Sequence, residues 1–220
     1  MTLKRQDEPG TAQLVAALER AWRAIASAHE DLPPAALILG QGSGRRGGGL
    51  ILGHFAAERW QLAGAADGAY VHEVLIGGEG LQRGAHDILA TLLHEGVHAI
   101  AAVRKIDDTS RQGRYHNARF RRIAEEGGLV VERDPVIGWS LTSLPHATAA
   151  AYASAIADLE RAITLHRRSE SSEVGGAGGS NLIAAACRCP RRIRVAPGTL
   201  AQGPIVCALC GARFEAVEAS

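Results

Sequence analysis

Leu92-Leu93-His94-Glu95-Gly96-Val97-His98-Ala99-Ile100 is the stretch on which the expected fold of this chain depends. It lies within residues 87–103, which contain one glycine, no proline and apolar residues at helical spacing: Ile88, Leu89, Leu92, Leu93, Val97, Ile100 and Val103. Residues four apart on an α-helix lie on the same face, so His94 and His98 can present two imidazole nitrogens to one metal ion. The sequence therefore predicts a helix that carries two metal ligands.

Glu95 stands between these histidines and would lie beside the metal ion. Its carboxylate can take a proton from the water that attacks a carbonyl and later return that proton to the leaving amine. These residue types at this spacing indicate peptide-bond hydrolysis with Glu95 as the catalytic base. The alternative is that two histidines on a packed helix face happen to bracket a glutamate.

A tetrahedral zinc site with two histidines needs a third protein ligand in addition to water. His116 is the next histidine along the chain; it follows a polar, turn-like segment at 107–113 and would start a short helix over 117–126. His116 is therefore the expected third ligand. Carboxylates remain the alternative ligands: Asp107, Asp108, Glu125 and Glu126.

The pattern His94-Glu95-x-x-His98, a polar loop and then Gly113-Arg114-x-His116-Asn117-x-x-Phe120 resembles the SprT-like metallopeptidases, the family that includes the Spartan proteases. The likeness covers roughly residues 45 to 135 and the cysteine-rich tail. It implies a small zincin-like domain in which His94, His98 and His116 bind a catalytic zinc and Glu95 is the general base. For Spartan-type members it also implies DNA repair through cleavage of proteins bound or crosslinked to DNA.

All four cysteines stand in the tail, as two close pairs: Cys187 with Cys189, and Cys207 with Cys210. Four thiolates at such spacing can converge on a structural zinc, which would supply most of the folding free energy of so small a segment, about 10 kcal/mol or more. We expect a zinc ribbon with strands at 192–195 and 204–206 and a turn at Pro197-Gly198. Two disulfides are the alternative reading of the same cysteines.

Positive charge accompanies both predicted metal sites. The ribbon holds candidate nucleic-acid contacts at Arg188, Arg191, Arg192 and Arg194. Residues 104–122 hold seven further lysines and arginines: Arg104, Lys105, Arg111, Arg114, Arg119, Arg121 and Arg122. Such clusters can bind phosphates, which makes DNA a candidate partner, although solvated surface explains them nearly as well.

Tyr115 adjoins the third expected ligand. Its hydroxyl could donate a hydrogen bond to the oxyanion that forms when water attacks. Ordinary packing is the alternative role for this side chain.

Composition and patterning predict an α+β chain. Its 220 residues are 46% hydrophobic with a formal net charge of +1. We expect a zincin-like domain at 1–167, a Gly/Ser-rich flexible linker at 168–182 and the zinc ribbon at 183–220. The expected elements are helices at 11–29 and 147–165, strands at 50–55, 70–76 and 129–131, and a glycine-rich loop at 40–49. Without an N-terminal signal segment or membrane-length apolar run, we expect a cytoplasmic protein with no membrane partner.

These features together predict a zinc endopeptidase with one catalytic and one structural zinc, acting on a protein substrate near DNA. Two other functions remain open. One is a nucleic-acid-binding or regulatory zinc protein whose zincin domain is only structural. The other is a repressor-specific protease that does not touch DNA, which salt-dependent DNA binding would distinguish.

Overall fold

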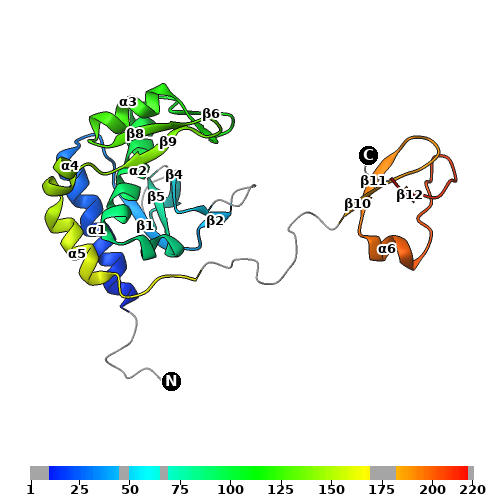
Figure 1. Ribbon diagram of the computed structural model, residues 1–220, viewed down its shortest axis with the longest axis horizontal. Coiled ribbons are helices and arrows are strands. Elements are labelled where there is room, and N and C mark those ends of the chain that lie inside the picture. Colours follow the sequence, from blue (N-terminus) through cyan, green and yellow to red (C-terminus); the bar gives the residue numbers. More distant parts are fainter. Residues whose placement is uncertain (1–9, 45–49, 65–68, 169–181, 218–220) are drawn as a thin grey trace, which may run out of the picture. The chain divides into compact units, whose positions relative to one another are not determined.

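The computed structural model describes residues 10–44, 50–64, 69–168 and 182–217 (Figure 1). The chain divides into two compact units, Met1–Ser169 and Glu170–Ser220, which are treated separately. Most of the predicted linker, residues 169–181, lies outside the described residues, as do residues 45–49 of the predicted glycine-rich loop.

The first sheet of the N-terminal unit has the order β1-β5-β4. Strand β1 (Ala35–Gly40) runs parallel to the central strand β5 (Tyr70–Gly77), and β4 (Gly53–Gln61) runs antiparallel to it. A short antiparallel pair, β2 (Ser43–Gly44) and β3 (Leu50–Ile51), precedes β4, and a 3-10 helix, η2 (Gly78–Arg83), follows β5. Strand β4 is thus an edge of this sheet.

A second sheet has the order β6-β7-β9-β8. Strands β6 (Thr109–Ser110) and β7 (Tyr115–His116) are two residues long, whereas β8 (Val130–Asp134) and β9 (Gly138–Ser143) form the longer antiparallel pair. Helix α3 (Ala118–Glu126) connects β7 to β8. A single parallel pairing, His116 with Gly138, joins the two halves of the sheet.

Helix α2 (Ala85–Val103) is the central element of the N-terminal unit and contacts strands of both sheets (Figure 1). Helices α1 (Thr11–Ala28), α4 (His146–Ala151) and α5 (Ala153–Ala162) lie together on one side of it. Twelve of the nineteen residues of α2 are buried, which its largely apolar sequence permits. The amphipathic helix α1 contributes its apolar stripe to the same core through Leu14, Leu18, Trp22 and Ile25.

Several sequence predictions are confirmed by these elements. The helix predicted at 87–103 is α2, the one at 11–29 is α1, and the strand at 70–76 is β5. Strands predicted at 50–55 and 129–131 correspond to β3 with the start of β4 and to β8. The coarse prediction of a mixed α+β chain is therefore correct.

Other predictions are wrong in detail. His116 does not start a helix: it ends β7, and Asn117 caps α3 by accepting the N–H groups of Arg119 and Phe120 on its side-chain oxygen. The single helix expected at 147–165 is two helices separated at Tyr152. Gly40 ends strand β1, which was not predicted, and Ser43–Gly44 form β2 rather than loop.

The C-terminal unit contains a small antiparallel sheet with the order β11-β10-β12. Its strands are β10 (Ile183–Ala186), β11 (Arg192–Val195) and β12 (Glu215–Ala216). The turn predicted at Pro197-Gly198 is instead the start of helix α6 (Pro197–Gln202), because proline is well suited to the first turn of a helix. The strand predicted at 204–206 is reduced to one bridge, between Val206 and Arg213. Within the described ranges, no helix is long and apolar enough to cross a membrane.

Candidate metal centres

Three imidazoles converge in the N-terminal unit. His94 and His98 lie on α2, and His116 comes from β7, with ligand atoms all within 4.8 Å of one another. The Nε2 atoms of His98 and His116 are 3.1 Å apart. Two nitrogens bound tetrahedrally to zinc at about 2.0–2.1 Å would lie about 3.3 Å apart. This donor set therefore fits a zinc ion with three protein ligands.

Phe120 supports all three imidazoles. Its ring centroid is 4.8 Å from that of His94, 4.9 Å from that of His98 and 4.4 Å from that of His116. The phenyl ring is completely buried and belongs to the first turn of α3, whose start is set by the Asn117 cap. The cap and this aromatic contact therefore hold the position of the His116 side chain relative to α2.

A second set of groups binds the outer nitrogens of the imidazoles. The Nδ1 atom of His98 lies 2.6 Å from Asp108 Oδ2, and that of His94 lies 3.0 Å from Thr142 Oγ1. For His116, Nδ1 lies 3.4 Å from the carbonyl oxygen of Ile137. Such contacts at Nδ1 orient a metal-binding histidine so that Nε2 faces the metal.

The carboxylates considered as alternative ligands are not part of the imidazole cluster. Asp108 contacts the outer side of His98, where it positions that ring. Glu125 pairs with Arg121, and Glu126 pairs with Arg104 and Arg122 on the surface. Thr142 was missed in the sequence, because a lone threonine on an unpredicted strand carries no motif.

Glu95 lies in the core beside this cluster, with 5% of its surface exposed. Burial raises the pKa of its carboxyl group to about 7, although the charge of nearby His98 and a hydrogen bond from the Phe55 N–H oppose the shift. A carboxyl group with a pKa near neutrality is suited to both accepting and returning a proton.

Strand β4 passes directly over Glu95. A Cβ atom on Gly53 would lie 2.5 Å from Glu95 Oε1 and 2.7 Å from Thr91 Cγ2, so only glycine fits at this position without displacing neighbours. The cluster opens onto two cavities, of about 430 Å³ and about 350 Å³, and both are lined by Gly53, His94 and Glu95. Together these cavities form a cleft along the edge of β4.

Tyr115 is not brought to this cleft. Its hydroxyl accepts a hydrogen bond from Arg133 at 3.2 Å, and the guanidinium of Arg111 lies 4.8 Å from its ring centroid. Neighbouring side chains on a strand point to opposite faces, so His116 faces the cluster while Tyr115 faces away. Tyr115 is therefore poorly placed for the oxyanion role considered from the sequence.

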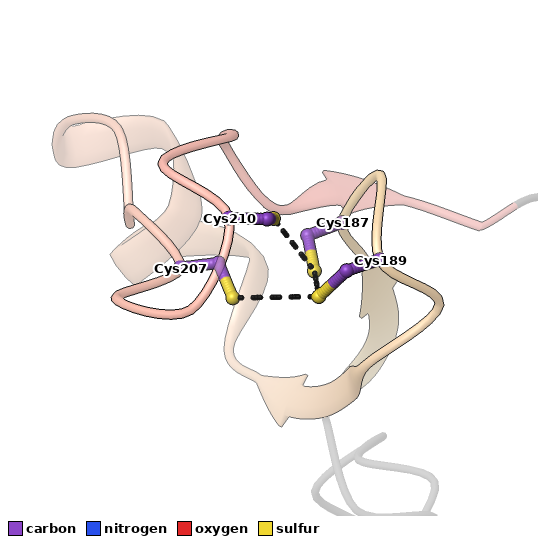
Figure 2. Close-up of side chains that lie close together, drawn as sticks. All are labelled: Cys187, Cys189, Cys207 and Cys210. Atoms are coloured by element: carbon purple, nitrogen blue, oxygen red, sulfur yellow. Dashed lines mark hydrogen bonds between the residues drawn. The ribbon is translucent and has the colours of Figure 1, made fainter.

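The four cysteines converge in the C-terminal unit (Figure 2). The Sγ atoms of Cys189 and Cys207 are 3.8 Å apart, as are those of Cys187 and Cys210, while Cys187 and Cys189 approach to 3.3 Å. Thiolates bound tetrahedrally to zinc at about 2.3 Å would be separated by about 3.8 Å. The cysteines are unbridged thiols rather than two disulfides, and their arrangement fits a metal ion.

Backbone donors favour the thiolate form at Cys207. Burial acts to raise its pKa, but N–H groups of Cys210 and Leu209 donate to the sulfur and lower the pKa to about 6. Arg191 Nη1 also lies 3.9 Å from this sulfur. A thiol that readily loses its proton is a better metal ligand at neutral pH.

The arginines proposed as nucleic-acid contacts are all exposed: Arg188, Arg191, Arg192 and Arg194. On β11, Arg192 and Arg194 alternate with Ile193 and Val195, which pack into the small core. Their contact with nucleic acid stays a prediction.

No protein-family model, curated protein or solved structure matches this chain.

We expect Asp108→Asn to weaken metal binding at the imidazole site by about 10- to 100-fold, because the loss of a charged partner at Nδ1 leaves His98 less basic and less well oriented. Competition with a chelator measures the affinity, and the absorption of bound Co²⁺ separates this site from the thiolate site. Asp107→Asn, at the neighbouring exposed carboxylate, is the control and should bind as the wild type does. Equal affinities for the two variants would contradict the role of Asp108.

We expect metal removal to unfold the C-terminal unit, since its core is small and the cysteines are central to it. Hydrogen exchange of the full chain after treatment with a strong chelator should show loss of protection at 182–217, while α1 remains protected. Metal analysis first establishes that the treated chain is metal-free. If residues 182–217 then keep their protection from hydrogen exchange, the C-terminal unit does not depend on metal for folding.

Proposed function

We propose that the N-terminal unit is a zinc-dependent endopeptidase with a zincin-like, SprT-like domain, and that its substrates are proteins bound or crosslinked to DNA. The observation that carries the proposal is the buried carboxylate of Glu95 beside three converging imidazoles, at the floor of a cleft. A metal site that only stabilises a fold has no need of such a carboxylate.

His94, His98 and His116 would hold the zinc ion. When bound, zinc supplies a Lewis acid that polarises a carbonyl group and lowers the pKa of water. Glu95 removes the proton from the attacking water and delivers it to the nitrogen of the leaving amine. Burial keeps this carboxyl group away from bulk solvent, and the Phe55 N–H holds one side of it.

The free edge of β4 supports a peptide substrate. Leu52 accepts a hydrogen bond from the Gly77 N–H, so its backbone faces β5. Because orientation alternates along an antiparallel pair, the backbone groups of Gly53 and the carbonyl of Phe55 face away from β5 and toward the cleft, while the Phe55 N–H donates to Glu95. An extended peptide can therefore pair with this edge directly above Glu95 and the imidazoles.

A row of alternating arginine and aromatic side chains supports the link to DNA. Arg111 lies over the ring of Tyr115, whose hydroxyl contacts Arg133. Arg133 and Arg121 in turn lie 6.0 Å and 4.4 Å from the ring centroid of Trp139. Aromatic faces that stack on bases, next to cations that neutralise phosphates, are typical of surfaces that bind single-stranded nucleic acid.

We expect Glu95→Gln to reduce cleavage of a DNA-binding protein by at least about 100-fold while zinc stays bound, since it removes the proton acceptor. Gel electrophoresis and mass spectrometry of the products, with and without single-stranded DNA, measure the effect. Glu19→Gln, on the exposed face of α1, is the control and should cleave as the wild type does.

Three outcomes separate the proposal from its rivals. DNA-stimulated cleavage that Glu95→Gln abolishes supports it. Cleavage confined to one repressor, independent of DNA, favours the repressor-specific protease. A zinc-loaded wild type that cleaves no protein favours the structural reading of the site.

We expect Trp139→Ala to weaken binding of single-stranded DNA by about 5- to 100-fold, because one stacked base is worth about 1–3 kcal/mol. Fluorescence anisotropy at several salt concentrations measures the affinity. Trp60→Ala, at an exposed tryptophan on β4 outside the arginine–aromatic row, is one control; because Trp139 is half-buried against the core, an unchanged thermal unfolding midpoint of Trp139→Ala is the second. If single-stranded DNA binding falls only in the double variant Arg192→Ala/Arg194→Ala, the DNA contact lies on the ribbon and not on the arginine–aromatic row.

A further inference from the structure

The two cavities of the cleft differ in charge. The cavity of about 430 Å³, called the His98 lobe, is lined by Asp107, by Asp108, whose carboxylate pairs with His98, and by no arginine or lysine. The cavity of about 350 Å³, called the Arg83 lobe, is lined by Arg83, and apart from Glu95 and the imidazole of His94 its remaining lining residues are uncharged. A peptide lying in the cleft thus meets negative charge on one side of Glu95 and positive charge on the other.

Arg83 is held in place by its neighbours. It is the last residue of η2, and its Nε donates to the carbonyl oxygen of Gly80 at 3.3 Å. Its Nη2 donates to Thr91 Oγ1 at 2.9 Å, and this hydroxyl donates in turn to the carbonyl of Asp87. Since Thr91 lies one helical turn before His94, these bonds fix the guanidinium beside the imidazole cluster.

The charge of Arg83 is available for a ligand. Neither hydrogen bond of its guanidinium goes to a carboxylate, and it forms no ion pair in the part of the chain that the structure describes. Its side chain is exposed toward the cleft. A guanidinium stays protonated at all ordinary pH values and matches the geometry of a carboxylate.

The direction of β4 determines which part of a substrate reaches Arg83. Leu52 lines the Arg83 lobe, while Phe55, further along the chain, lines the His98 lobe. Antiparallel pairing, the more stable arrangement, runs a substrate from the His98 lobe toward the Arg83 lobe. The residues that follow the scissile bond would therefore lie beside Arg83.

We propose that Arg83 is a specificity-determining residue that selects substrates with a carboxylate on the C-terminal side of the scissile bond. This inference rests on the proposed peptidase function. The carboxylate is either an Asp or Glu side chain or the terminal carboxylate of the substrate. Asp107 on the opposite side disfavours an acidic residue before the scissile bond, because two carboxylates repel each other.

The test is a comparison of cleavage preferences. A peptide library with free C-termini and the same library with amidated C-termini are digested by the zinc-loaded full-length protein, and mass spectrometry locates the cleaved bonds. Selected acidic, neutral and basic peptides are then compared by kcat/KM. The variants are Arg83→Gln, Arg83→Glu and the control Arg23→Gln, an exposed arginine of α1 that lines neither lobe.

The expected result is a preference of about three- to fivefold for acidic over neutral peptides, the scale of a solvent-exposed charge pair. Arg83→Gln removes this preference, Arg83→Glu replaces it with a preference for peptides with lysine or arginine, and Arg23→Gln retains it. A reversed charge preference in Arg83→Glu cannot arise from misfolding. Preference that survives amidation identifies an acidic side chain, and preference that amidation abolishes identifies the terminal carboxylate.

Two results would overturn the proposal, and they are distinguishable. Cleavage that depends on Glu95 but shows no carboxylate preference, or a preference that Arg83→Glu leaves unchanged, removes the role of Arg83 and leaves the peptidase function intact. Absence of Glu95-dependent cleavage removes the peptidase function and the specificity together.

Discussion

The convergence of three imidazoles is the constraint on which the N-terminal unit depends. His94 and His98 are one helical turn apart, so α2 alone brings them together. His116 must come from a separate segment, and the Asn117 cap and the buried ring of Phe120 hold that segment against α2. The contacts of Asp108 and Thr142 at the outer nitrogens then orient the rings. Both supports belong to the second sheet: Thr142 lies on β9, and Asp108 directly precedes β6.

Glu95 is a buried carboxyl group without an ion-pair partner among the described residues. Burying such a group costs free energy, which appears here as a raised pKa. The buried carboxylate lies where strand β4 approaches α2 closely. Gly53 of β4 has no side chain and so leaves room for the carboxylate. The same close approach brings the edge of β4 over the site, so that, under the proposed function, burial of the base and access for an extended peptide come from one packing arrangement.

The C-terminal unit depends on a different interaction. Its core contains few large side chains, and two of the five buried residues in it are cysteines. The backbone N–H groups around Cys207 favour the thiolate form of that one cysteine, whereas the hydrogen bond with Cys187 raises the pKa of the Cys189 thiol. Arg191, a candidate nucleic-acid contact by its charge, also contacts one of these sulfurs. In this unit a basic residue can therefore serve the metal site.

The sequence by itself determined the features that arise from short-range spacing. Four-residue spacing put His94 and His98 on one face of a helix, the run of apolar residues made that helix buried, and the two close cysteine pairs indicated a joint metal site. His116 was expected as a ligand because it is the next histidine along the chain and fits the resemblance, although its place at the end of a strand was not predicted. Local periodicity carries this information because it depends only on neighbouring residues.

Only the tertiary structure decided which distant side chains meet. Thr142 and Arg83 carry no motif, and strands β1 and β9 were not predicted, although each has six residues. In the sequence, Asp108 was one of four equivalent candidate ligands, and only the fold shows that it contacts His98. Tyr115 was a candidate site residue, but strand alternation points its side chain away from the cleft. Contacts between segments far apart in sequence depend on how sheets and helices pack, which local spacing does not encode.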